Sequence, residues 1–126
     1  MQRKRVLNCP HGFSTATGFE PDGDLAYAIC KDEDTGYWLS VSRFPNEDDL
    51  VELMVQDQIV SKTREVMVEL RPDEFRLTLS GLAAAQLDGT LEYVVPLSPN
   101  ADLRQLDAAL SVIFDGRHGG TYVRNL

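Results

Sequence analysis

Cys9 and His11 are the residues whose types and spacing come closest to a reactive site. A thiol beside an imidazole can form a nucleophile with its general base, or two of the four ligands of a zinc ion. The sequence provides no second ligand pair at regular spacing, and a segment rich in proline and glycine does not hold a nucleophile against its base. We interpret Cys9-Pro10-His11 as an ordinary loop without a catalytic or metal-binding role.

Carboxylates are plentiful, and they gather in two clusters, Asp32-Glu33-Asp34 and Glu47-Asp48-Asp49. Paired carboxyls hydrolyse glycosides only when a cleft holds them about 5 to 10 Å apart and raises one pKa, and nothing in the sequence fixes such a pair. Asp32 and Asp34 resemble the start of a calcium loop, but Tyr37 and Arg43 occupy the positions of its required glycine and glutamate. The sequence also lacks the Walker, G-x-G-x-x-G, H-E-x-x-H and G-x-S-x-G signatures. We therefore predict a protein that is not an enzyme and that uses no cofactor and no metal.

Acidic residues are unevenly distributed along the chain. Residues 20–74 carry 15 acidic and 5 basic side chains, a charge of −10, whereas the whole chain has a net charge of −8. A concentrated negative surface repels nucleic acid and anionic lipid, and it attracts basic proteins by long-range steering. We therefore expect a basic protein partner, and neither nucleic acid nor a membrane.

The length of 126 residues and the composition predict a single globular domain with a core of its own. No stretch reaches the roughly 20 apolar residues that cross a bilayer, and the basic start at residues 1–7 lacks the apolar segment of a signal peptide. Two cysteines are too few for a disulfide framework, and Cys30 ends an apolar run where a small buried thiol fits. These features predict a cytoplasmic protein in which Cys9 and Cys30 are not joined.

Alternating apolar residues predict two β-hairpins, one at residues 25–30 and 37–43 and one at residues 66–70 and 75–79. In the second hairpin, Pro72 suits the first central position of the turn. Residues 46–58 fit either a helix capped at Asn46 or a strand in which Val51, Leu53 and Val55 alternate with other residues, and we favour the strand. Further strands are predicted at residues 91–95 and 121–123.

Two helices are predicted in the second half of the chain. The alanine-rich residues 82–87 have high helix propensity, and Gly89 can end that helix. Residues 101–114 carry a leucine stripe at helical spacing, with Ser98 or Asn100 as the cap. Residues 1–23, rich in glycine and proline, are expected to form an irregular arm, with room for a short strand at 5–7. The elements together predict an α+β fold, a mainly antiparallel sheet of about five to seven strands packed on one face by the C-terminal helix and the short alanine-rich helix.

Trp38, the only tryptophan, lies on the opposite side of its predicted strand from Tyr37, Leu39 and Val41. Packing beneath a helix is the commoner outcome for such a residue, and we favour it. The alternative is display at the surface as an interface anchor, because large aromatic side chains contribute much of the energy of protein binding. Beside the acids at 32–34, an exposed Trp38 would form a docking point for a basic protein.

Several local patterns follow one another in the order seen in one bacterial family. They are the strand Tyr37-Trp38-Leu39-Ser40-Val41-Ser42-Arg43, a strand ending at Asp57-Gln58, the Val-x-Val-x-Leu, Arg-Pro-Asp and Phe-Arg-Leu-x-Leu hairpin, the helix Ala83-Ala84-Ala85-Gln86-Leu87, and the helix ending Ile113-Phe114-Asp115-Gly116. From Tyr37 to about Gly116 the chain resembles the immunity protein 10 family of polymorphic toxin systems. The resemblance implies an antitoxin that binds a cognate toxin inside the producing cell and blocks its action.

The acid clusters and the tryptophan are the candidate partner-binding residues: Asp32, Glu33, Asp34, Trp38, Glu47, Asp48 and Asp49. A secretion chaperone is the alternative function, because such chaperones are small acidic α+β proteins that hold effectors, although they usually begin with a helix. An enzyme whose site is invisible in one sequence, and an unassigned structural or regulatory domain, are further alternatives.

Overall fold

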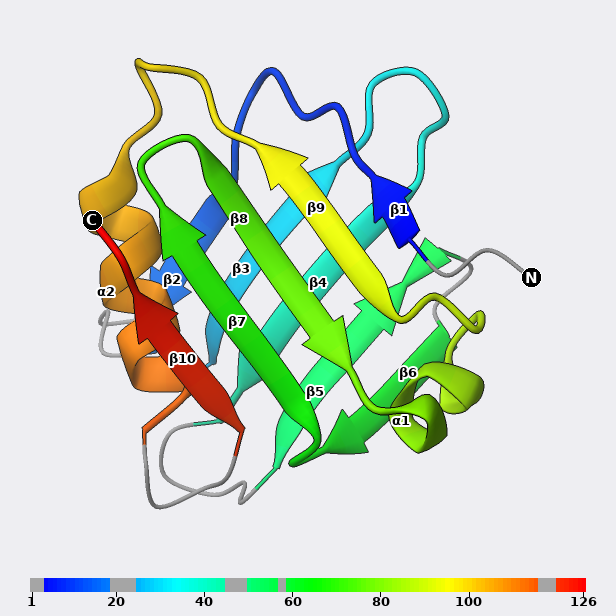
Figure 1. The fold of residues 1–126 in the computed structure, drawn as a ribbon. Helices are drawn as coiled ribbons and strands as arrows, with labels where there is room; N and C mark the ends of the chain where they lie inside the picture. Colours follow the sequence, from blue (N-terminus) through cyan, green and yellow to red (C-terminus); the bar gives the residue numbers. More distant parts are fainter. Residues whose placement is uncertain (1–3, 19–24, 45–49, 57–58, 116–119) are drawn as a thin grey trace.

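Two five-stranded sheets lie face to face in the computed structural model, with a helix at each side (Figure 1). The structure describes residues 4–18, 25–44, 50–56, 59–115 and 120–126. The front sheet of Figure 1 contains, in order, β1 (Lys4–Val6), β9 (Glu92–Pro96), β8 (Glu74–Leu79), β7 (Val66–Arg71) and β10 (Thr121–Arg124). The back sheet contains β2 (Ser14–Thr17), β3 (Ala26–Lys31), β4 (Trp38–Arg43), β5 (Val51–Val55) and β6 (Ile59–Thr63).

Neighbouring strands pair antiparallel throughout the back sheet and in the middle of the front sheet. Only the edge strands of the front sheet pair in parallel, β1 with β9 and β10 with β7. Because β1 and β10 come from opposite ends of the chain, the front sheet is completed by long-range pairing that no local pattern can specify.

The core lies between the two sheets. Each sheet turns one face inward, since side chains alternate between the two sides of a strand. The inward residues of the front sheet include Val68, Leu70, Phe75, Leu77 and Tyr93, and those of the back sheet include Ala28, Leu39, Val41, Leu53 and Val55. All of these side chains are fully buried, so hydrophobic contact between the sheets is the main force that holds the fold together.

The helices close the two open sides of this sandwich rather than covering one sheet face. The longer helix, α2 (Leu103–Ile113), lies against β2, β3 and β10, while α1 (Gly81–Gln86) lies against β6 and β8. The N-cap of α2 is Asp102, whose carboxylate accepts a hydrogen bond from the backbone N–H of Gln105 at 3.2 Å. The predicted caps Ser98 and Asn100 were therefore wrong, because the helix begins at Leu103, the first leucine of the stripe, and not at the predicted residue 101.

Arg43, the last residue of β4, is a buried cation on the inward side of the strand. Only 2% of its surface is exposed, and its guanidinium donates hydrogen bonds to the carbonyls of Val112 and Ile113 at the end of α2. A helix C-terminus carries unpaired carbonyls and partial negative charge, so a fixed cation stabilises it. Arg43 thereby ties α2 to the back sheet.

The α+β class and both hairpins are confirmed, but the architecture has ten described strands in two sheets instead of one sheet of five to seven. The region 46–58 contains strand β5, as favoured. The arm at 1–23 is not wholly irregular, because it supplies β1 and β2. Strand β6, a polar and exposed edge strand, was not predicted.

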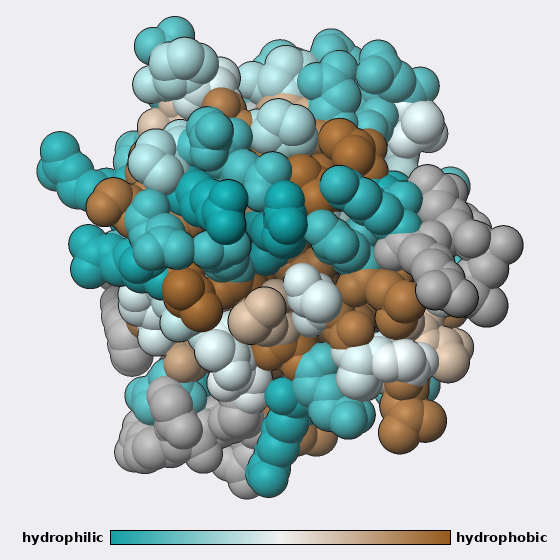
Figure 2. Space-filling model, in the orientation of Figure 1, coloured by the Kyte–Doolittle hydropathy of each residue, from teal (hydrophilic) through white to brown (hydrophobic). Residues whose placement is uncertain are grey.

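The outer face of the front sheet carries several ion pairs between side chains of β7, β8 and β9. Arg76 lies 2.9 Å from Glu74 and 3.5 Å from Glu92, and Arg71 lies 3.1 Å from Glu69. Figure 2, which views this face, shows hydrophilic residues across its middle. Because opposite charges alternate on neighbouring strands, this face neutralises itself and stays solvated.

Candidate functional site

The outer face of the back sheet differs from that of the front sheet, because it carries large apolar side chains. Tyr27, Ile29, Trp38, Met54 and Val60 project from it, and we call these five residues the open face. Val60 is 42% exposed, and the other four are half-buried. Among the described residues, both helices contact the inward side or the flanks of the sheets, so none of the described elements covers the open face.

The strand register places the open-face residues in rows. Ile29 pairs with Ser40, Ser40 with Met54, and Met54 with Val60, so one row crosses four strands. In the next row Tyr27 pairs with Ser42. The central strand β4 thus carries small, buried serines between larger side chains. Glu52 and Lys62 continue the row of Tyr27 and Ser42, so charged side chains border the apolar ones on this face.

A hollow of about 460 Å³ adjoins the open face at the edge of β3. Ile29 and Lys31 of the outer face line it, together with the chain at His11 to Ser14 and the turn at Asp32 and Glu33. A flat sheet face cannot enclose a partner's side chain, whereas a recess beside an apolar patch can accept one that protrudes. The open face and this edge hollow together form the candidate site.

The turn at the end of β3 corrects one expectation. Asp32 was predicted to be a solvated surface acid, but it is only 5% exposed. Its carboxylate accepts hydrogen bonds from the backbone N–H groups of Asn8, Asp34 and Thr35, at 2.8, 2.8 and 2.9 Å. The hydrogen bond from Asn8, with those from Thr35 and Asp34, lowers the pKa of Asp32 and keeps it charged. Asp32 therefore stabilises the turn. Because its carboxylate is buried and already hydrogen-bonded, we no longer count it among the candidate partner-binding residues.

The remaining predicted site residues are only partly assembled. Glu33 and Asp34 are exposed in the β3–β4 turn, and Trp38, at the start of β4, pairs with Lys31 at the end of β3. Trp38 is half-buried, and the hydrogen bonds between β4 and α2 are made by Arg43, on the opposite side of the strand from Trp38, so they give no support to the preference for a tryptophan packed beneath a helix. Glu47, Asp48 and Asp49 lie outside the described residues.

Sequence reasoning missed Tyr27, Ile29, Met54 and Val60. The signal was present in β3, where Tyr27 and Ile29 alternate with the small residues Ala26, Ala28 and Cys30. Such a strand is apolar on both faces and indicates burial on both sides. Only the structure shows that the outer side is left without a described covering element.

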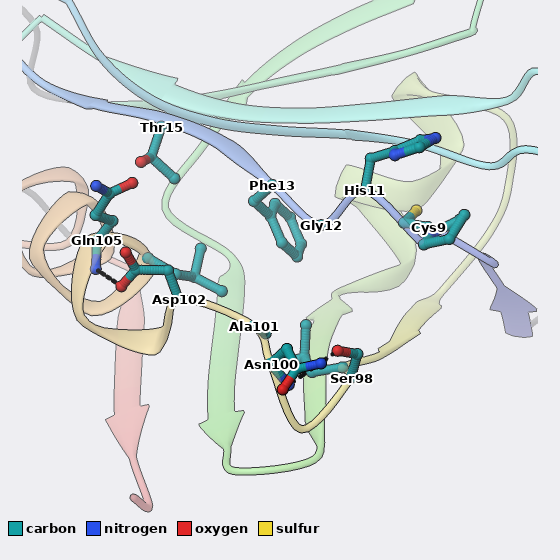
Figure 3. Close-up of a pocket in the computed structure, with 13 residues that line it drawn as sticks. Cys9, His11, Gly12, Phe13, Thr15, Ser98, Asn100, Ala101, Asp102 and Gln105 are labelled. Carbon is teal, nitrogen blue, oxygen red and sulfur yellow. Dashed lines mark hydrogen bonds between the residues drawn. The ribbon is translucent and has the colours of Figure 1, made fainter.

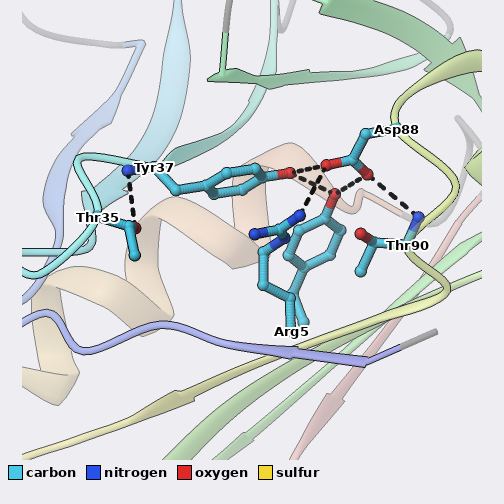
Figure 4. A network of polar contacts seen from close by, with 6 residues as sticks. Arg5, Thr35, Tyr37, Asp88 and Thr90 are labelled. Carbon is cyan, nitrogen blue, oxygen red and sulfur yellow. Dashed lines mark hydrogen bonds and ion pairs between the residues drawn. The ribbon is translucent and has the colours of Figure 1, made fainter. Parts of the chain in front are cut away.

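Asp88 lies at the centre of a second polar cluster, between the two sheets (Figure 4). Its carboxylate accepts hydrogen bonds from the hydroxyl of Tyr37 at 2.5 Å, the hydroxyl of Tyr93 at 3.1 Å and the backbone N–H of Thr90 at 3.1 Å. The guanidinium of Arg5 lies 3.5 Å from the same carboxylate and 4.0 Å above the ring of Tyr37. The cluster therefore joins β1 and β9 of the front sheet to the start of β4 in the back sheet.

The pKa values in this cluster do not suit proton transfer near neutral pH. Burial, followed by the hydrogen bond to Asp88, raises the pKa of Tyr37 well above its usual value, and burial raises the pKa of Tyr93 to about 12. Burial also opposes charge on Asp88, but hydrogen bonds from both tyrosines and Thr90 bring its pKa below the usual value. An acid–base catalyst works best with a pKa near the working pH, so we assign this cluster a structural role.

A pocket of about 350 Å³ lies between the residue 9–15 segment and the start of α2 (Figure 3). The ring of Phe13 packs against Phe75 at 4.8 Å between centroids, and Asp102 and Gln105 stand at one end. Cys9 and His11 stand at the other end. Within the described residues there is no group of three or more His, Cys, Asp or Glu side chains placed to hold a metal ion.

Comparison with known proteins found no matching family model, no similar curated protein and no similar solved structure. Neither of the two described helices has the length and apolar character needed to cross a bilayer. The functional argument therefore rests on the geometry of this chain.

Proposed function

We propose that this chain is an immunity protein, which binds a basic protein toxin in the cytoplasm of the producing cell and blocks its action. The open face is its docking surface. The observation that carries the proposal is the row of large apolar side chains on the outer face of the back sheet, uncovered by the described elements, beside a recess at its edge.

The chemistry of the open face favours a protein as the occupant. Tyrosine, tryptophan and methionine are enriched at the centres of protein interfaces, and Tyr27, Trp38 and Met54 provide one of each. The front sheet offers a useful contrast, because its outer face pairs its charges internally. A contiguous apolar patch on a protein surface commonly marks a site of association.

Charge complementarity favours a basic partner. The back sheet is built from residues 14–63, which lie largely within the acidic segment 20–74. Seven of the 15 acids of that segment lie outside the described residues, in the links between strands of this sheet. A toxin that acts on nucleic acid must be basic to bind phosphate, so an acidic inhibitor meets it rapidly and competes for the same surface.

Two methionines on opposite outer faces allow a charge-matched test. Met54 is on the open face, and Met67 is 43% exposed on the front sheet. The probe is the purified C-terminal domain encoded by the gene immediately upstream, and the measurement is its dissociation constant for the wild-type chain, Met54→Lys and Met67→Lys. Both substitutions change the net charge equally, so a difference between them reports contact and not overall electrostatics.

We expect Met54→Lys to weaken binding at least about 30-fold, corresponding to about 2 kcal/mol, and Trp38→Ala to do the same. Met67→Lys should change the dissociation constant by less than about threefold, the effect of a distant charge in salt. The association rate should fall steeply as salt rises, and inhibition of the toxin should follow the same order of variants. Equal loss in the two methionine variants would place the interface elsewhere, and no binding to the upstream product would remove the immunity function.

A further inference from the structure

Cys9 and Cys30 lie beside one another in the core, although 20 residues separate them in the chain. Two sets of backbone contacts bring them together. On one side, Asn8 accepts a hydrogen bond from the N–H of Glu33 at 2.9 Å; on the other, Ser14 of β2 pairs with Ile29 of β3. The segment between residues 8 and 14 therefore runs alongside the end of β3. Between these two sets of contacts the N–H of Gly12, whose φ is +69°, donates a hydrogen bond to the carbonyl of Cys9 and closes a tight turn.

The two thiols are in direct contact and differ in character. They share a hydrogen bond, which lowers the pKa of Cys9 even though burial and the charge of Asp32 oppose this. The same hydrogen bond, together with burial, raises the pKa of Cys30. Both cysteines are unoxidised in the structure, with 8% of Cys9 and 2% of Cys30 exposed. Cys9 is also the more exposed of the two thiols, so it is the better placed to attack an incoming disulfide.

Small molecules can approach this pair from two directions. Cys9 lines the pocket of Figure 3, and Cys30 lines the edge hollow on the other side of the residue 9–13 segment. A buried structural cysteine normally has no such opening, whereas redox-active cysteines are accessible and have a resolving thiol close by.

We infer that Cys9 and Cys30 form a reversible dithiol–disulfide site that exchanges with small disulfides such as glutathione disulfide. The Cys9 thiolate attacks one sulfur of glutathione disulfide, forms a mixed disulfide and releases one glutathione thiolate. The Cys30 thiol then gives up its proton to solvent and attacks the Cys9 sulfur, so that the second glutathione leaves. The protein loses two electrons and two protons, and one glutathione disulfide becomes two glutathione molecules.

This bond links the segment before β2 covalently to β3. Residues 11–13 line both pockets, so a disulfide at Cys9 restrains the segment that separates them. It also closes a loop in the unfolded chain, and loop closure lowers the entropy of that state. The oxidised protein is therefore expected to unfold at a higher temperature than the reduced protein. The inference is independent of the proposed function.

The test incubates the full wild-type chain with glutathione disulfide and follows intact mass and free thiols. We expect a loss of about 2 Da and of both free thiols, a peptide map that joins residue 9 to residue 30, and reversal by dithiothreitol. Thermal unfolding of the two forms should show a higher Tm for the oxidised form. A product with two stable glutathione adducts, a disulfide-linked dimer, or an unmodified chain would each overturn the inference.

Single cysteine variants separate the two roles. Cys30→Ser should stop at the mixed disulfide and gain about 305 Da on Cys9, because no resolving thiol remains. Cys9→Ser should react at least about tenfold more slowly, since the remaining thiol is almost fully buried. Circular dichroism checks the fold of both variants, with Cys30→Ala and Cys9→Ala as replacements if serine is not tolerated. Faster modification of Cys30 than of Cys9 would contradict the assigned roles.

Discussion

At the residue scale, Asp32 and Arg43 are buried charged side chains that pair with backbone groups. Asp32 accepts three backbone N–H hydrogen bonds in the β3–β4 turn, and Arg43 donates to two carbonyls at the end of α2. Burying a charge is unfavourable unless it is hydrogen-bonded, and removing one partner leaves the other unpaired. Both residues are therefore structural, although charged side chains first suggest function.

Replacing Arg43 by methionine should lower the free energy of unfolding by about 1–3 kcal/mol, because the carbonyls of Val112 and Ile113 lose their donors. Urea denaturation measures this change. Arg104→Met is the control, because Arg104 is exposed on α2 and its removal should cost less than about 0.5 kcal/mol. Equal effects of the two substitutions would show that Arg43 does not stabilise the end of α2.

At the element scale, β10 is fixed between β7 and α2. The hydroxyl of Tyr122 donates to Asp107 of α2 at 2.7 Å, and Arg124 lies 3.2 Å from the same carboxylate. Before β10, Gly120 passes next to Phe114, with φ of +76°. A Cβ atom at Gly120 would lie 3.0 Å from the ring of Phe114. A side chain at this position would therefore have to displace the ring of Phe114 and adopt a left-handed backbone conformation, both of which glycine avoids.

Two glycines allow this steric effect to be isolated. Gly89 also has a positive φ, +87°, but a Cβ atom there would meet nothing within 4 Å. Gly89→Ala should cost about 1–2 kcal/mol from backbone conformation alone. Gly120→Ala should cost a further 1–3 kcal/mol or so, because it also overpacks Phe114. Chemical denaturation measures both variants, and a Gly120→Ala cost no larger than that of Gly89→Ala would contradict the packing argument.

At the scale of the whole molecule, the two sheets are held by their apolar inner faces and by the polar cluster at Asp88. The hydroxyls of Tyr37 and Tyr93, 2.9 Å apart, come from different sheets and meet at that carboxylate. Asp32 adds a second link, because it binds the segment after β1 to the end of β3. The stability of the sandwich should therefore depend on the charge of two carboxyls and on two protonated tyrosines.

The pH dependence follows from the directions of these pKa shifts. Asp32 and Asp88 have pKa values below those of the unfolded chain, so their contribution is complete above about pH 5 and is lost as the pH falls through the folded-state values, below about 4. Tyr37 and Tyr93 have raised pKa values, so their contribution is complete below about pH 10 and is lost above it. The free energy of unfolding should be highest between these limits, as urea titrations across pH would show.

Variants test which groups cause this profile. Asp32→Asn and Asp88→Asn should each reduce the loss of unfolding free energy at acid pH. Tyr93→Phe should reduce the loss at alkaline pH. Asp73→Asn, at an exposed position in the β7–β8 turn, is the control and should leave the slope unchanged. An acid slope that is the same in Asp32→Asn, Asp88→Asn and the wild type would assign the dependence to other groups.

The sequence by itself determined the local elements, because their signals lie within a few neighbouring residues. Alternation and Pro72 predicted the β7–β8 hairpin, and the leucine stripe predicted α2. The sequence also indicated that Cys30 is buried. The local pattern was weak in the short strands β1, β2 and β6, and the prediction there was incomplete or absent. Only β1 depends on a distant strand, because it pairs with β9, whereas β2 and β6 pair with the adjacent strands β3 and β5.

Only the tertiary structure decided which side of each strand is covered and which charges are buried. Tyr27 and Ile29 look like core residues in the sequence, yet they face outward, opposite Ala26, Ala28 and Cys30, and they stay half-buried because no described element packs over that side of the back sheet. Asp32 looks like a surface acid, yet backbone N–H groups from three residues surround it. Burial and pairing depend on residues far apart in the chain, and such contacts are set by the packing of the two sheets and not by local spacing.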